Sequence, residues 1–193
     1  MRLREAFARI GIPEPWGTVA IRPVRVYGDP VLRRKSAPVT AAPESVRELV
    51  TDMFDTMYHE PGIGLAAPQI GVSMRVVVVA AVPDDDDGKN VGRPFAMLNP
   101  VLVSRSDDTT RFEEGCLSVP DINETVERPR AIRFRYTSLD GDALERDAAG
   151  LLARVVQHEL DHLDGVLFVD RLSLVKRQLL RKRLARLGAA PRG

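Results

Sequence analysis

The sequence predicts an α+β fold in which antiparallel strands pack around one buried central helix, with another helix near the C-terminus. Gly150 precedes a stretch of about 14 residues that is apolar on most sides at helical spacing, which is typical of a helix surrounded by core. Residues 75–82 form a largely β-branched run, and residues 131–139 alternate apolar with charged side chains. These patterns indicate a buried strand and a half-buried strand. A length of 193 residues suits a single domain over 1–193.

Other elements follow from helix and turn signals. Residues 43–59 carry apolar side chains at helical spacing, and Pro61-Gly62 is a usual helix stop. A turn at Asp140-Gly141 closes the half-buried strand. The remaining expectations are an N-terminal arm at 1–20, an extended segment at 21–32, a solvated acidic loop at 84–87, a strand at 95–104, and a basic C-terminal helix and tail at 171–193 whose helix spans about 172–187.

Composition excludes several classes of protein. Lys plus Arg number 28 and Asp plus Glu 27, so the overall charge gives no reason to expect nucleic acid binding. No apolar stretch approaches the roughly 20 residues of a membrane span, and the N-terminus has no signal-peptide pattern. We therefore expect a cytoplasmic protein without a membrane partner. The one cysteine, Cys116, excludes a disulfide scaffold.

The predicted central helix carries His158-Glu159-Leu160-Asp161-His162, an H-E-x-x-H motif. Two histidines four residues apart lie on the same face of a helix, so both rings can reach one metal ion. Glu159 lies between them and is close enough to handle a water molecule at that ion. Three polar side chains on a buried helix require such a reason, because burying polar groups without partners is costly.

The third metal ligand has to be sought elsewhere in the chain. The extended zinc-protease motif places a histidine where this chain has Phe168, and no Glu, His or Cys follows His162. A zinc-type endopeptidase is therefore a weaker interpretation. Upstream, we interpret His59 as a surface histidine at a helix end, which leaves Cys116 as the favoured ligand, although an upstream Asp or Glu stays open.

Three motifs together resemble a known family. GIGLAAPQ at 62–69, EGCLSVP at 114–120 and QHELDH at 157–162 occur in the order of the three peptide deformylase motifs. The resemblance covers about residues 22–172, and every diagnostic position matches. It implies removal of the N-formyl group from the first methionine of new polypeptides. A non-catalytic metal-binding or RNA-binding protein is the remaining alternative, and replacement of Glu159 or Gln69 would have favoured it.

The resemblance also implies residue roles. Cys116, His158 and His162 would bind the metal, and Glu159 would accept a proton from the attacking water and pass it to the leaving amine. The Gln69 side-chain amide and the Leu117 backbone N–H would stabilise the oxyanion. The residues implied to bind the substrate are Ile63, Gly64, Phe112, Leu151 and Val155, with Gly62 and Gly64 allowing close approach of the peptide main chain.

Two further expectations concern charged residues beside these motifs. Arg154 occupies a helix position where an apolar residue also occurs in the family, and we expect its charge at the pocket mouth. We also expect an ion pair between Glu114 and Arg128 that holds the Cys116 segment in place.

The resemblance implies Fe²⁺ as the metal, with Ni²⁺, Co²⁺ or Zn²⁺ able to replace it. The residues alone do not select iron, because a Cys-His-His set also suits zinc. No acidic residue follows Asp170, so the C-terminal helix is basic. Its simplest interpretation is an amphipathic helix packed on the domain, and transient docking on ribosomal RNA is the alternative. The sequence leaves open the oligomeric state, the role of residues 1–20 and any side-chain preference beyond methionine.

Overall fold

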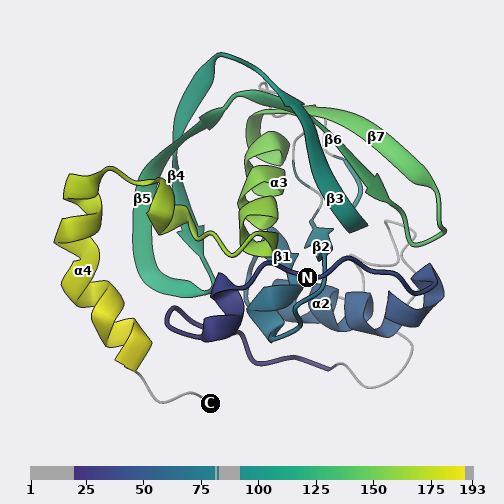
Figure 1. The fold of residues 1–193 in the computed structure, drawn as a ribbon, viewed down its shortest axis with the longest axis horizontal. Coiled ribbons are helices and arrows are strands. Elements are labelled where there is room, and N and C mark those ends of the chain that lie inside the picture. Colours follow the sequence, from purple (N-terminus) through teal and green to yellow (C-terminus); the bar gives the residue numbers. More distant parts are fainter. Residues whose placement is uncertain (1–19, 81, 83–91, 190–193) are drawn as a thin grey trace.

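The computed structural model describes residues 20–80, 82 and 92–189. Figure 1 shows helix α3 near the centre, with the β4–β5 hairpin on one side and β3, β6 and β7 on the other. The helices are α2 (Arg47–His59), α3 (Gly150–Leu163) and α4 (Leu174–Ala189), and the strands are β1 (Gly64–Ala66), β2 (Val76–Val79), β3 (Phe95–Arg105), β4 (Thr109–Cys116), β5 (Val119–Pro129), β6 (Ala131–Thr137) and β7 (Ala143–Ala149).

The strands form two antiparallel sheets. One has five strands in the order β1-β2-β3-β6-β7, and the other is the two-stranded sheet β4-β5. The order leaves β1 at an edge of the larger sheet. The predicted α+β fold with antiparallel strands around a buried helix is confirmed.

Helix α3 is buried because its apolar side chains point in nearly every direction. Eleven of its residues are buried, including the polar Glu159 and His162. The helix ends at Leu163, and Gly165 follows two residues later with a φ of +75° that suits glycine. A Cβ there would lie 2.6 Å from the Arg33 carbonyl oxygen, so glycine also permits close packing of the following chain.

The apolar residues form two clusters. The larger joins α2, α3 and the five-stranded sheet, and the second joins the β5 strand, the turn at 168–171 and α4. Cys116 packs against the second cluster, whereas α3 contributes to the first. The chain around Cys116 and the histidine-bearing helix therefore belong to different parts of the core.

Helix α4 packs less completely than its leucine pattern suggests. Leu180 and Leu184 are buried, but Leu174, Val175 and Leu179 are 75%, 69% and 76% exposed. Two polar contacts add to the attachment: Lys176 pairs with Glu124, and Arg183 donates to the Asp121 carbonyl oxygen. The predicted helix at 172–187 is thus confirmed with shifted bounds, and one of its apolar faces is open.

Other predicted elements differ in extent from those observed. Residues 43–46 form a 3-10 turn before α2, and the buried strand covers only Val76–Val79. Strands β1, β4, β5 and β7 were not predicted. The acidic loop at 84–87 and all but residue 20 of the arm lie outside the described residues, as do the last four residues of the tail. Among the described helices, none is long and apolar enough to cross a membrane.

Candidate active site

Ten of the eleven predicted site residues line one pocket of about 560 Å³ between β1, the β4–β5 hairpin and α3. His162, the eleventh, is not among the lining residues, but it lies one helical turn beyond His158, with a ring nitrogen within 4.8 Å of a ligand atom of each of Cys116 and His158. The ten are Ile63, Gly64, Gln69, Phe112, Cys116, Leu117, Leu151, Val155, His158 and Glu159. Segments far apart in the sequence therefore meet as the three motifs predicted.

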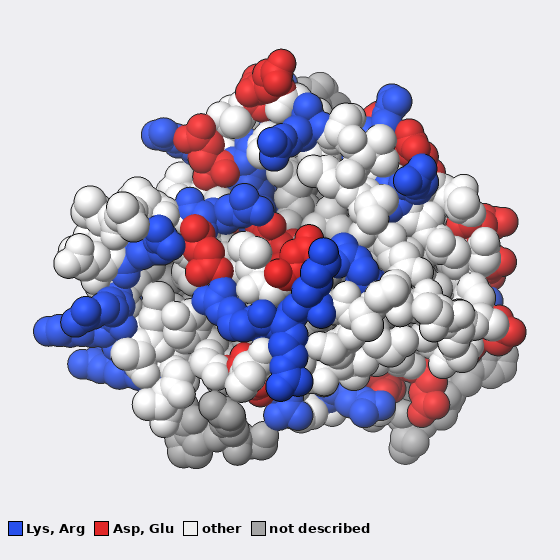
Figure 2. Space-filling view, in the orientation of Figure 1, with Lys and Arg blue, Asp and Glu red and all other residues white. Residues whose placement is uncertain are grey.

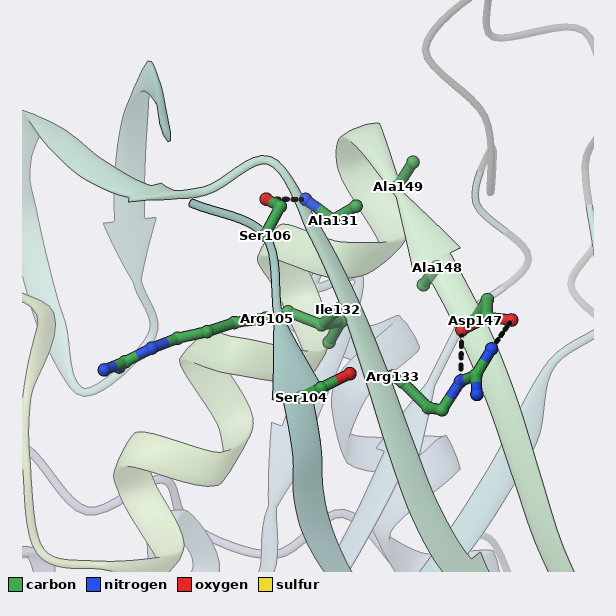
Figure 3. Close-up of a pocket in the computed structure, with 9 residues that line it drawn as sticks. All are labelled: Ser104, Arg105, Ser106, Ala131, Ile132, Arg133, Asp147, Ala148 and Ala149. Atoms are coloured by element: carbon green, nitrogen blue, oxygen red, sulfur yellow. Dashed lines mark hydrogen bonds and ion pairs between the residues drawn. The ribbon is translucent and has the colours of Figure 1, made fainter. Parts of the chain in front are cut away.

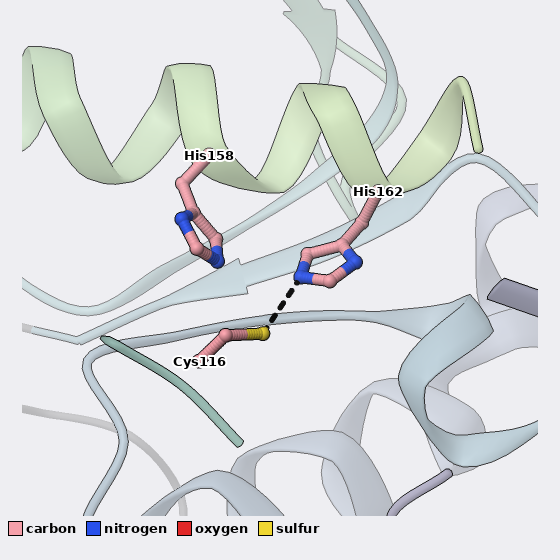
Figure 4. Close-up of side chains that lie close together, drawn as sticks. All are labelled: Cys116, His158 and His162. Atoms are coloured by element: carbon pink, nitrogen blue, oxygen red, sulfur yellow. Dashed lines mark hydrogen bonds between the residues drawn. The ribbon is translucent and has the colours of Figure 1, made fainter. Parts of the chain in front are cut away.

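Cys116, His158 and His162 form a compact group of potential metal ligands. One ligand atom from each lies within 4.8 Å of the other two. The Cys116 Sγ atom is 3.2 Å from His162 Nε2, and Figure 4 shows both imidazoles pointing from α3 toward the cysteine. A thiolate and two imidazoles fit a divalent transition metal.

Local structure explains how these three side chains converge. The histidines are four residues apart on α3 and so share one face. Cys116 ends β4 and pairs with Val119 across a two-residue turn, with a register shift between Glu114 and Cys116. Such a shift turns the strand, and here it accompanies the cysteine that points toward the helix.

His162 has an electrostatic setting that suits a neutral ligand. Burial, followed by the positive charge of His158, lowers the pKa of His162 well below its usual range. Its Nδ1 atom is buried and has no hydrogen-bond partner among the described residues. A neutral imidazole is the form that binds a metal.

Glu159 lies beside this group without being part of it. Its Oε2 atom is buried and has no partner in the described part of the chain. Burial is the main cause that raises the pKa of Glu159 to about 7, against the positive charges of His158 and Arg128. A carboxyl group with a pKa near 7 can both accept and donate a proton at physiological pH, as a general acid–base group requires.

The Gln69 side chain is held in a defined orientation. Its Oε1 atom accepts a hydrogen bond from the Ala66 backbone N–H at 2.8 Å, so its Nε2 group faces the hairpin. There it lies 3.7 Å from Cys116 Sγ and 3.4 Å from Ser118 Oγ. Gln69 is only 1% exposed, and its amide therefore presents N–H groups next to the metal-ligand group.

The expected ion pair between Glu114 and Arg128 is confirmed. Arg128 donates through Nε to Glu114 Oε1 at 2.7 Å and through Nη2 to Oε2 at 2.9 Å. Glu114 Oε2 also lies 3.0 Å from His158 Nδ1. Burial alone would raise the pKa of Glu114, but the bonds from His158 and Arg128 hold it well below its usual range. The carboxylate thereby orients the His158 ring and leaves its Nε2 atom available.

The expectation for Arg154 was wrong in one respect. The residue lines the pocket, but its guanidinium is not at the mouth: it is 7% exposed and turned toward the hairpin. Nη1 donates to Glu114 Oε1 at 2.6 Å and Nη2 to the Thr110 carbonyl oxygen at 2.9 Å. A buried carboxylate and nearby carbonyl groups therefore hold the charge inside. The separate expectation that His59 is a surface residue is confirmed, with 56% of its side chain exposed.

The other clefts lack such a group. The shallow groove on β3, β6 and β7 is shown in Figure 3, where Arg133 pairs with Asp147 at 2.7 Å along the sheet. None of its nine lining residues is a histidine or cysteine. Among the described residues, the Cys-His-His group is the one such cluster found, so the chemistry concentrates at the α3 pocket.

Comparisons with known proteins agree with this geometry. The family model for polypeptide deformylase matches residues 21–178. The chain belongs to the polypeptide deformylase family. It is 46% identical over 175 residues to a peptide deformylase of Rhodopseudomonas palustris, covering 91% of this chain and 98% of that one.

Solved structures give the same result. A peptide deformylase from Legionella pneumophila has a TM-score of 0.75 and 42% identity, covering 90% of this chain and all of that one. A class I type b peptide deformylase from Acinetobacter baumannii, solved with Met-Ala-Ser bound, has a TM-score of 0.74 and 36% identity over 80% of this chain. The family assignment and the interpretation as a hydrolase are confirmed.

Sequence reasoning did not assign a contact to three residues near the pocket. Ser118 lies against the Gln69 amide, Asp161 accepts a bond from Arg128, and Thr110 accepts from Arg154. Only Asp161 carried a signal, since it is an additional acid on a helix that is otherwise buried. The other two contacts depend on the hairpin, which the sequence pattern did not predict.

Proposed function

We propose that this protein hydrolyses the N-formyl group from the first methionine of newly synthesised polypeptides, releasing formate. The observation that carries the proposal is the Cys116-His158-His162 group beside a buried Glu159 of raised pKa in a substrate-sized pocket. Membership in the family supports the same reaction.

We infer that Cys116, His158 and His162 hold one Fe²⁺ ion, with Ni²⁺, Co²⁺ or Zn²⁺ able to replace it. The mixed sulfur and nitrogen donors suit all four ions. When bound, such an ion polarises a carbonyl group and lowers the pKa of water. The partner-free Glu159 Oε2 fits a ligand-bearing site, because a buried carboxylate oxygen without a bond is otherwise costly.

Glu159 accepts a proton from the attacking water and returns it to the departing amine in this proposal. Its raised pKa suits both steps near pH 7. The Gln69 amide N–H group and the Leu117 backbone N–H donate to the oxygen that becomes negative when the formyl carbon turns tetrahedral. Loss of one such donor typically lowers the rate about 100- to 1000-fold.

The substrate binds along β1 and the apolar wall of the pocket. Because β1 is an edge strand, its free side can pair with a peptide main chain, and Gly64 has no side chain to obstruct it. Ile63, Phe112, Leu151 and Val155 supply apolar surface for the methionine side chain. The Acinetobacter relative that binds Met-Ala-Ser supports a peptide beginning with methionine.

The decisive experiment measures formate released from formyl-Met-Ala-Ser by anaerobically prepared, Fe²⁺-loaded protein and by Glu159→Gln. We expect rapid release by the wild type and a loss of about 100- to 10,000-fold in the variant with metal retained. Unformylated Met-Ala-Ser-containing peptides serve as a control for endopeptidase activity. Absence of formate from fully metallated wild type would contradict the proposal.

We also propose a cytoplasmic location with transient ribosome contact through α4. Exposed basic residues on α4 include Arg177, Lys182 and Arg186. Deleting residues 171–193 is a poor test, because it would remove the buried Leu180 and Leu184.

A double charge reversal, Lys182→Glu with Arg186→Glu, leaves that packing intact. We expect ribosome cosedimentation to weaken and to be more sensitive to salt, with formate release from short peptides unchanged. The matched control is Arg34→Glu with Arg135→Glu, two exposed arginines on other elements. Equal cosedimentation of both variants and the wild type would refute the contact.

A further inference from the structure

Five charged side chains of alternating sign form a continuous line from the substrate pocket to the other side of α3. They are, in order, Arg154, Glu114, Arg128, Asp161 and Arg171. The first two line the pocket described above, and the last three line a separate cleft of about 610 Å³. In Figure 2, charged side chains of both signs gather near the middle of the view, over α3.

Each interior member of the line lies between two opposite charges. Arg128 is 3% exposed and divides its donors between Glu114 on one side and Asp161 on the other, the latter at 2.8 Å from Nη1 to Oδ2. Asp161 in turn accepts from Arg171 Nη2 at 2.5 Å through Oδ1. A buried arginine held at both ends has little freedom to rotate.

Three residues on one face of helix α3 contact the Glu114–Arg128 pair. Arg154, His158 and Asp161 are separated by four and three residues and so face the same side. Arg154 and His158 contact Glu114, and Asp161 contacts Arg128. Glu114 lies on β4, two residues before Cys116, so these contacts connect the histidine-bearing helix to the cysteine-bearing strand.

We propose that Asp161 is a positioning residue for the metal ligand His158, acting through Arg128 and Glu114. Removing its charge leaves Arg128 with one anionic partner in a buried place, and the guanidinium then shifts relative to Glu114. Glu114 Oε2 is the acceptor next to His158 Nδ1, so the ring loses its fixed orientation. This inference rests on the metal site of the proposed function and extends it to the far side of the helix.

The test compares Asp161→Asn with Asp164→Asn. Asp164 lines the same cleft, and its carboxylate pairs with Arg75 at 2.8 Å. Among the described residues, that carboxylate makes no hydrogen bond or ion pair with Arg128 or Glu114. Both variants and the wild type are loaded with Co²⁺, and release of the ion to excess chelator is followed by its visible absorption. We expect release about tenfold faster in Asp161→Asn and unchanged in Asp164→Asn.

Two further readouts separate positioning from a general loss of stability. The Co²⁺ absorption bands should shift in Asp161→Asn, since they report ligand geometry, whereas stability alone would change only the metal-free melting temperature. If Asp161→Asn does not fold, Arg171→Gln should give a smaller increase in release rate that Arg171→Lys reverses.

The outcomes are distinct. Equal release rates and equal spectra for Asp161→Asn and Asp164→Asn would overturn the positioning role while leaving the proposed function intact. A wild-type protein that binds no Co²⁺ would overturn the metal site itself, and this inference with it.

Discussion

Glu159 illustrates how burial sets the chemistry of a single side chain. Its carboxyl group lies against the backbone of Gly64, and its pKa is raised to about 7 from the ordinary value of 4.5, chiefly by burial. The folded metal-free protein therefore keeps this proton at a pH where the unfolded chain has released it. The consequence is a stability that depends on pH.

We predict that metal-free wild type loses stability relative to metal-free Glu159→Gln as the pH rises. The folded pKa is above the unfolded one, so the stabilising contribution is present below pH 4.5 and is lost as the pH passes about 7. The shift corresponds to a loss on the order of 3 kcal/mol. Urea unfolding of both proteins at pH 5 and pH 8 measures it, and parallel changes in the two would contradict the prediction.

At the scale of elements, strand β1 packs so closely against α3 that there is no room for a side chain at Gly64. It pairs with β2 on one side, and a Cβ placed on Gly64 would lie 2.5 Å from Glu159 Oε1 and 2.8 Å from Val155 Cγ1. Real Cβ atoms do not approach this closely, so either the strand or the carboxylate has to move.

We predict that Gly64→Ala lowers kcat/KM for formate release about 100-fold while metal content stays unchanged, because the carboxylate is displaced from its position. Steady-state kinetics with formyl-Met-Ala-Ser and metal analysis check both parts. The matched control is Gly92→Ala, since a Cβ there would meet nothing within 4 Å. Wild-type kinetics in Gly64→Ala would contradict this prediction and show that β1 moves without displacing the Glu159 carboxylate.

The elements differ in how well their sequences predict them. Helix α3 was predictable because apolar spacing and burial coincide along its length. Strand β4 was not, because Glu114 is its only buried residue and it has no apolar alternation. Its buried position is polar, and the partners come from Arg128, Arg154 and His158, at least 14 residues away. Arg154 was placed wrongly at the pocket mouth for the same reason, because its partner Glu114 is 40 residues away in the sequence.

At the scale of the whole molecule, the two apolar clusters differ in the elements that shield them from solvent. The second cluster depends on α4, whose Leu180 and Leu184 complete it. Leu179 lies on the same helix but is 76% exposed. The sequence places all three leucines in one amphipathic pattern, so only the packed structure distinguishes the core position from the surface position.

We predict that Leu184→Ala lowers the free energy of unfolding by about 2–4 kcal/mol, whereas Leu179→Ala changes it by less than about 0.5 kcal/mol. The first substitution leaves a cavity in the second cluster, and the second removes a side chain from solvent. Urea denaturation of the metal-loaded proteins tests both, and equal effects would mean that α4 is not bound as described.

The division of the core has a consequence for how the protein unfolds. Cys116 packs against one cluster and α3 belongs to the other, so an ion held by the proposed ligands would join the two as a cross-link. Such a cross-link makes the loss of one cluster costly for the other. The metal-loaded protein should therefore melt in a single calorimetric transition, and chelation should separate it into two, the earlier one belonging to the smaller cluster and α4.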